Sequence, residues 1–150
     1  MIADPAALHP PNPDLRATCN SASSSALPEF SDMVLEVDGR FVAGNGGDWA
    51  VHLRNWRDSA GGAGNYSVAV DIISRVTILR NETWRTVLLA EEQAAFIKDR
   101  QEPNHVQIIA RGPQIAMLVN GEVTAFATDP EPFERGMVGL TACNFGDTLL

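Results

Sequence analysis

The sequence predicts an all-β domain, an antiparallel sandwich or barrel, and three observations carry this prediction. Beyond residue 29, apolar residues recur mostly at every second position, as in strands with one buried face. Turn signals rich in Gly and Asn separate these segments at intervals of about eight to twelve residues. The chain has 150 residues, of which 45% are hydrophobic, enough for one domain with its own core.

The first 29 residues differ in composition from the rest. They hold five of the nine prolines and the polar run CNSASSSA. Such a segment buries too little apolar surface to offset the entropy lost on ordering. We therefore expect residues 1–29 to be a disordered tail or linker and residues 30–150 to form the domain.

The first two predicted strands alternate clearly. In DMVLEVDGRFV, one face holds Met33, Leu35, Val37 and Phe41, and the other holds Val34, Glu36, Asp38 and Arg40. In AVHLRNW, alternation turns Val51 and Leu53 inward and His52, Arg54 and Trp56 outward. The segments between and after these strands, GNGGDW and RDSAGGAGN, are glycine-rich turns or loops.

Three further strands follow in YSVAVDII, SRVTILR and TWRTVLL, with a turn expected at Asn81-Glu82. We expect Trp49 and Trp84 to cap the core. The one helical candidate is EEQAAFIKDR at 91–100, which begins with acids and ends with bases as the helix dipole prefers. The same ten residues also fit a long loop.

A hairpin is predicted within RGPQIAMLVNGEVTAF. Asn120-Gly121 is the pair that a two-residue type I′ turn prefers, because both of its central residues need a positive φ. Before the turn Ile115, Met117 and Val119 share one face; after it, that face continues with Val123, Ala125 and Ala127.

The charge pattern narrows the classes of partner. A net charge of −8 without a cluster of Lys or Arg argues against nucleic acid, and no apolar run is long enough to span a membrane. No signal peptide is visible. Cys19 and Cys143 lie far apart in the sequence, which allows either two free thiols or one disulfide between them.

Several segments resemble consecutive strands of the bacterial concanavalin A-like jelly-roll domains. They are FSDMVLEVDGRFV, DWAVHLRNWRDS with NYSVAVD, NHVQIIARGPQIAMLVNGEVTAF and RGMVGLTA. These laminin-G-like sandwiches are related in fold to family 16 glycoside hydrolases and 3-keto-disaccharide hydrolases. The resemblance implies an antiparallel sandwich and an extracellular or cell-surface location, but names no reaction.

The resemblance also implies a closing strand that would pair near the beginning of the chain. Either the Pro- and Ser-rich tail supplies a substitute, or the sheet has an open edge at which another chain could pair.

Candidate catalytic and metal-binding residues are few. Glu36 and Asp38 share a strand face, as do the acids of family 16 enzymes, but Arg40 stands where the second glutamate would be. The three histidines and two cysteines lack metal-site spacing. The sequence leaves a calcium site open, with Asp48 and Asp58 as its ligands, and we expect no other cofactor.

A binding surface fits the sequence best. His52, Arg54 and Trp56 are expected on one outer face, beside Asp71 and Arg75 if neighbouring strands pair in order. We expect a non-catalytic module that binds carbohydrate or an extracellular ligand within a larger bacterial surface or secreted protein. The alternatives are a glycosidase-like enzyme using Glu36 and Asp38, and an assembly module that pairs through an open sheet edge.

Overall fold

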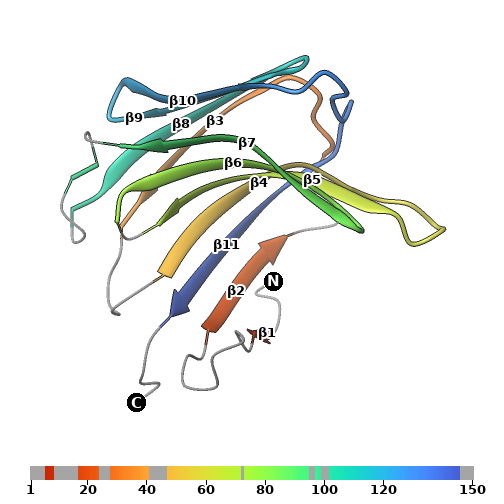
Figure 1. Cartoon of the computed structure of the whole chain (residues 1–150), viewed down its shortest axis with the longest axis horizontal. Coiled ribbons are helices and arrows are strands. Elements are labelled where there is room, and N and C mark those ends of the chain that lie inside the picture. Colours follow the sequence, from red (N-terminus) through yellow and green to blue (C-terminus); the bar gives the residue numbers. More distant parts are fainter. Residues whose placement is uncertain are drawn as a thin grey trace.

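A computed structural model describes residues 6–8, 17–23, 28–40, 47–71, 73–94, 97–98 and 102–145. They form an antiparallel sandwich of two sheets (Figure 1). The larger sheet has seven strands in the order β1-β2-β11-β4-β5-β6-β7, and the smaller has four in the order β10-β9-β8-β3. No described residue is helical, and so no helix there could cross a membrane. The predicted all-β sandwich is confirmed.

The strand bounds follow the predicted alternation closely. The strands are β1 (Ala6–Leu8), β2 (Ala17–Ser23), β3 (Met33–Gly39), β4 (Gly47–Arg57), β5 (Ala63–Asp71), β6 (Arg75–Glu82), β7 (Arg85–Gln93), β8 (Asn104–Arg111), β9 (Gln114–Val119), β10 (Glu122–Thr128) and β11 (Met137–Phe145).

The core lies between the two sheets and is aliphatic. β-Branched and other aliphatic side chains at alternate positions of β4, β5, β6, β8 and β9 are fully buried, and among them are Val51, Leu53, Val68, Val76, Ile78, Val106, Ile108, Ile115, Met117 and Val119. Burying such side chains contributes roughly 1.5–3 kcal/mol each, which is the main force holding the sheets together. The outer faces are therefore left for polar residues.

The predicted hairpin is confirmed in detail. Asn120 and Gly121 have φ of 52° and 88°, and Glu122 pairs with Val119 across the turn. One residue departs from the alternation: Val123 is 64% exposed, because the register shifts between Val123 and Ala125. A bulge of this kind moves the residue before it off the buried face.

Part of the expected tail belongs to the larger sheet. Residues 17–23 form β2, which pairs along its whole length with β11 (Figure 1). β2 thus covers the edge of β11, so of the two alternatives the chain uses its own N-terminal segment. Composition concealed this strand because β2 consists of small and polar residues, ATCNSAS, which pair through their backbone. Residues 6–8 of the expected tail form β1, which pairs with β2. Residues 1–5, 9–16 and 24–27 of that tail lie outside the described residues.

The two cysteines lie opposite each other where β2 pairs with β11. The register of β11 on β2 places Cys143 opposite Cys19, and Cys143 is disulfide-bonded. Of the two states that the sequence left open, the structure shows the bonded one.

The sequence left a helix and a long loop open for 91–100, and the described residues of this segment form no helix. Residues 91–93 complete β7, and none of the other described residues in that segment is helical. The turn before β7 also lies later than predicted, at Thr83 and Trp84 rather than at Asn81-Glu82. Trp84 therefore sits at a hairpin tip with 95% of its surface exposed and does not cap the core.

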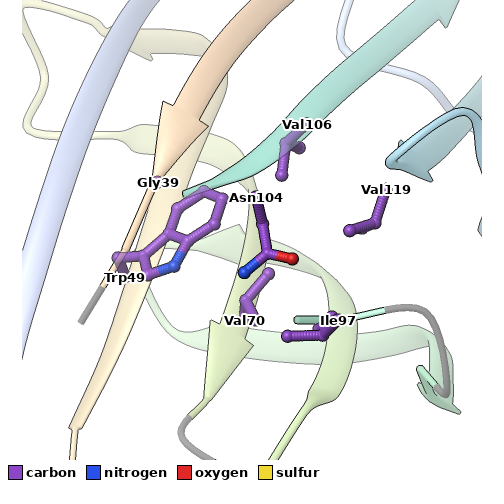
Figure 2. A pocket seen from close by; sticks show the side chains of 7 residues that line it. All are labelled: Gly39, Trp49, Val70, Ile97, Asn104, Val106 and Val119. Atoms are coloured by element: carbon purple, nitrogen blue, oxygen red, sulfur yellow. The ribbon is translucent and has the colours of Figure 1, made fainter. Parts of the chain in front are cut away.

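Trp49 does cap the core, at one end of the sandwich. Figure 2 shows its indole beside Gly39, where an added Cβ would lie 2.9 Å from the ring. Asn104 closes the same end, because its carboxamide oxygen accepts from the Lys98 amide at 2.7 Å and from Asn120 at 3.0 Å. The cavity left between these groups is about 10 Å³, too small for a ligand.

Candidate ligand-binding face

The strand β4 places its predicted site residues on different sides. Val51 and Leu53 point into the core, which turns His52 to the outer face of the larger sheet. The register of β4 on β5 then shifts between Leu53 and Trp56, and Arg54 adopts a φ of 48°. This bulge ends the alternation, so Arg54 and Trp56 do not share the outer face with His52.

Arg54 is a structural residue. Only 2% of it is exposed. Its Nε donates to the carbonyl of Ser31 at 2.7 Å, and its Nη1 donates to the carbonyls of Gly112 and Phe133 at 2.8 and 2.9 Å. The guanidinium thus joins three segments that are distant in sequence and is not available to a ligand. The expectation of an outward Arg54 was wrong.

Trp56 is likewise not an open aromatic platform. Its indole meets Phe133 edge-on, with ring centroids 5.8 Å apart. The backbone of Gly64 lies so close that an added Cβ would be 2.7 Å from the indole Nε1, and that nitrogen is buried without a partner among the described residues. Trp56 therefore packs within the fold.

A polar network crosses the outer face of the larger sheet around His52. Six side chains from five adjacent strands take part, and we call them the His52 network: Thr141 on β11, His52 on β4, Asn65 and Ser67 on β5, Asn81 on β6 and Thr86 on β7. Three of its contacts join residues that are directly opposite across neighbouring strands, namely His52 with Ser67, Asn65 with Asn81, and Asn81 with Thr86. Sheet register therefore fixes the network.

The hydrogen bonds of the network are short. Nε2 of His52 lies 2.8 Å from the Thr141 hydroxyl, and Nδ1 lies 2.9 Å from the Ser67 hydroxyl. The Asn81 amide donates both to Ser67 at 2.8 Å and to Asn65 at 3.0 Å. The hydroxyl of Thr86 in turn donates to the Asn81 carbonyl oxygen at 3.1 Å.

The network is uncharged at neutral pH. Burial lowers the pKa of His52, a shift that its hydrogen bond with Asn65 and the charge of Asp48 oppose only in part. A neutral imidazole carries one donor and one acceptor nitrogen, and the hydroxyls of Ser67 and Thr141 can serve either tautomer. The centre of the face can therefore offer both donors and acceptors without a net charge.

An acidic end adjoins this neutral centre. Asp48 lies opposite Asp71 across β4 and β5. Arg75 holds Asp71 through its Nε at 2.9 Å, and the Ile73 and Arg75 amides donate to the same carboxylate. Burial, and then the charge of Asp71, raises the pKa of Asp48. Asp71 and Arg75 thus lie on the same face as His52, displaced along the strands.

The face also has an apolar part. Leu79 stands opposite Ser67 on β6, and Leu88 stands opposite Leu79 on β7. Leu88 is 55% exposed. The Asn65 amide nitrogen donates to no described residue, so it is a donor left over beside the network. Apolar contacts beside fixed polar groups are what a small polar ligand requires.

The other predicted site residues lie elsewhere. Glu36 and Asp38 are on the outer face of the smaller sheet, where Gln107 donates to Glu36 at 2.8 Å and His105 contacts Asp38 at 2.9 Å. Asp58 accepts from the amides of Ala60 and Gly62 in the loop after β4, whereas Asp48 lies near the start of that strand. Nine residues of extended strand between them span about 30 Å, so these two acids cannot share an ion.

Among the described residues, no group of three or more His, Cys, Asp or Glu side chains could hold a metal ion.

Sequence reasoning found His52 but missed the rest of its network. Asn65 was not singled out as a site residue, and Asn81 was assigned to a turn. One signal was available: Asn is depleted in strands, so an Asn inside each of two adjacent strands needs an explanation. Asn65 and Asn81 lie on the same outer face of the larger sheet as Asp71.

Comparisons with known proteins bear on the fold. No family model and no curated protein matches the chain. Among solved structures, a carbohydrate-binding module, CBM66 from Bacillus subtilis, matches 98% of this chain and 91% of its own at 19% identity and a TM-score of 0.68. Sheep galectin-11 in complex with glycerol matches 87% and 92% at 10% identity, with a TM-score of 0.59.

A third structure, a Bacillus licheniformis β-glucanase, matches 89% of this chain and 67% of its own at 10% identity, with a TM-score of 0.55. All three are β-sandwiches of one kind, and the resemblance predicted from the sequence is confirmed at the level of fold. The chain therefore has the concanavalin A-like jelly-roll fold.

Proposed function

We propose that the protein binds carbohydrate on the outer face of the larger sheet, as a non-catalytic module of a larger bacterial surface or secreted protein. The observation that carries this proposal is the His52 network, which holds amide, hydroxyl and imidazole groups in fixed positions across five strands. Two of the compared proteins are a carbohydrate-binding module and a glucanase by name, and the galectin structure holds glycerol, a polyol.

The chemistry of the face suits a sugar. A sugar offers hydroxyls that both donate and accept, together with patches of C–H groups. The network supplies neutral donors and acceptors, and Leu79 and Leu88, on β6 and β7, supply an apolar surface beside it. Because the side chains are already held by one another, binding would require little loss of conformational entropy.

A glycan array, followed by calorimetric titration of the glycans that bind, tests the proposal. Asn81→Ala removes the amide that donates to both Asn65 and Ser67, and His52→Ala removes the centre of the network. We expect each variant to bind at least about tenfold more weakly, the effect of one or two lost hydrogen bonds. His105→Ala is the matched control, because that imidazole is half exposed on the other sheet.

The proposal fails if a folded protein binds no glycan, or if His52→Ala and His105→Ala bind equally well. Trp56→Ala does not serve as the test, since that indole packs against Phe133 and its loss would disturb the fold itself.

A further inference from the structure

A second hollow lies at the opposite side of β6, away from the His52 network. It is a cleft of about 230 Å³ between the β6–β7 hairpin and the segment 129–131. Its polar walls are formed by Arg80, Glu82 and Arg85 from the hairpin and by Asp129 and Glu131 from the segment. Arg80 follows the inward alternation of β6, whereas Asn81 belongs to the outer face, so the two sites use different faces of one strand.

The back of this cleft is held rigid by a buried ion pair. Asp129 is 2% exposed; its carboxylate accepts from the Tyr66 hydroxyl at 2.6 Å and from Nη1 of Arg80 at 3.1 and 3.2 Å. Nη2 of Arg80 donates to Glu82 at 2.6 Å, and the guanidinium carbon lies 4.7 Å from the centre of the Phe133 ring. Burial raises the pKa of Tyr66 to about 12, so its hydroxyl remains a donor.

Two charged side chains at the cleft, Arg85 and Glu131, can form hydrogen bonds with a ligand. Arg85 and Glu131 are exposed, and neither side chain makes a hydrogen bond or ion pair with a described residue. The position of Glu131 is nevertheless fixed, because its amide donates to Asp129 at 3.0 Å. A donor and an acceptor therefore face a rigid cleft from opposite walls.

The remaining lining is apolar. Val87 and Leu89 come from β7, and Pro130 from the facing segment. Trp84, 95% exposed, occupies the turn that separates Glu82 from Arg85. The indole of Trp84 does not line the cleft itself, but Trp84 directly precedes the lining residue Arg85, so its signal can report on a ligand bound there.

We propose that this cleft is a second ligand site and that it takes a single neutral sugar unit, such as the end of a saccharide chain. Its volume is below that of the pockets that hold drug-sized ligands, which limits the occupant to about one ring. Three carboxylates and two guanidiniums line it, so a charged ligand would meet groups of its own sign, whereas hydroxyls can pair with both. This site goes beyond the proposed outer-face site and does not depend on it.

Nuclear magnetic resonance titration of the ¹⁵N-labelled protein tests the proposal. The probes are the methyl glycosides of glucose, galactose, mannose and fructose, each raised to about 10 mM because single sugar units bind weakly. The three indole N–H signals act as internal reporters, since Trp84 is exposed while Trp49 and Trp56 are packed. We expect at least one probe to shift the Trp84 signal and the amides of Arg85 and Glu131.

Substitutions separate this site from the outer face. Arg85→Leu removes a charged donor, and Glu131→Gln replaces a charged acceptor by a neutral one. Each should weaken the response at Trp84 at least about fivefold, because hydrogen bonds to charged groups are the stronger ones. Arg111→Leu and Glu122→Gln, exposed charges on the smaller sheet, should have no effect. His52→Ala should also leave the Trp84 response unchanged.

Two results would overturn the proposal: no probe shifts Trp84 or its neighbours, or the shifts vanish in His52→Ala and persist in Arg85→Leu. The second result would leave the outer-face function standing and remove only the cleft. A response to the methyl glycoside of glucuronic acid that exceeds every neutral probe would also contradict the neutral ligand class.

Discussion

At the scale of single residues, Arg54 joins parts of the chain that the strands alone do not hold. Its guanidinium binds the carbonyls of Ser31, Gly112 and Phe133. These carbonyls lie before β3, in the β8–β9 turn and in the connection to β11. One side chain of the larger sheet therefore satisfies two acceptors beside strands of the smaller sheet and one in the connection between the sheets.

Replacing Arg54 should destabilise the protein strongly. Arg54→Met keeps an apolar stem but leaves three carbonyls without their donor, and we expect a loss of about 2–4 kcal/mol in the free energy of unfolding. Arg57→Met, exposed on the same strand, should change it by no more than about 0.5 kcal/mol. Urea denaturation of both variants checks this, and similar effects at the two positions would contradict the role assigned to Arg54.

His52 should make stability depend on pH in a defined direction. Its pKa in the folded protein is lowered, so below the unfolded value of about 6.5 the unfolded chain binds more protons. The contribution of His52 is thus complete above about pH 6.5 and is lost as the pH falls towards the folded pKa. Asp48, whose pKa is raised, acts in the opposite sense at lower pH.

The comparison of His52→Gln with the unaltered protein isolates this effect. Denaturation between about pH 7.5 and 5.5 should show that stability falls with acidification less steeply in His52→Gln. His105→Gln, on the other sheet, is the control. Equal slopes in His52→Gln and the unaltered protein would mean that His52 does not supply this pH dependence.

His52 and Arg54 also show where side-chain alternation along a strand predicts orientation correctly and where it does not. It predicted His52 correctly because β4 is regular up to Leu53. It misplaced Arg54 and Trp56 because a bulge follows, and a bulge changes the direction of every later side chain in the strand. The local sequence HLRNW does not predict that bulge, because the carbonyls that Arg54 binds there are distant in sequence.

At the scale of elements, β2 and β11 close the larger sheet. β2 pairs with β11, and Cys143 of β11 is disulfide-bonded at the position opposite Cys19. An unpaired β11 would expose a row of backbone groups at the edge of the sheet. The bond therefore keeps an N-terminal strand of weak strand propensity in place.

Removing this bond should weaken the whole domain. Cys19→Ser with Cys143→Ser opens a loop of more than about 100 residues, and the expected loss is about 2–5 kcal/mol in the free energy of unfolding. Reduction of the unaltered protein should give the same loss, and the double variant should no longer respond to reductant. Unchanged stability in both experiments would show that β2 holds without the bond.

The elements differ in how well the sequence predicted them. The turn at Asn120-Gly121 was predicted to the residue, because its turn chemistry agrees with the apolar alternation of β9, whereas the bulge that exposes Val123 was not predicted. β2 was not, since its stability comes from β11 and from a disulfide, both more than a hundred residues away. The segment 91–100 was open between a helix and a loop, because its charges match a helix dipole, although its first residues complete β7.

At the scale of the whole molecule, the last strand occupies an interior position in the larger sheet. Figure 1 shows β11 between β2 and β4, and the register pairs it with both. Strands from the start, the middle and the end of the chain are therefore neighbours. The sandwich cannot complete its larger sheet until β11 is in place, and most of its contacts are long-range, which favours slow folding.

A chain that ends at Arg135 should consequently fail to fold. It would leave β4 with an open inner edge, separate β2 from the sheet and remove Cys143. We expect narrow amide dispersion and no cooperative thermal transition. Supplying residues 136–150 as a separate peptide under oxidising conditions should restore part of the dispersed spectrum, because the missing strand can pair with β2 and β4 from outside. A truncated chain that unfolds cooperatively without the peptide would show that β3 to β10 form an independent core and that β11 only extends it.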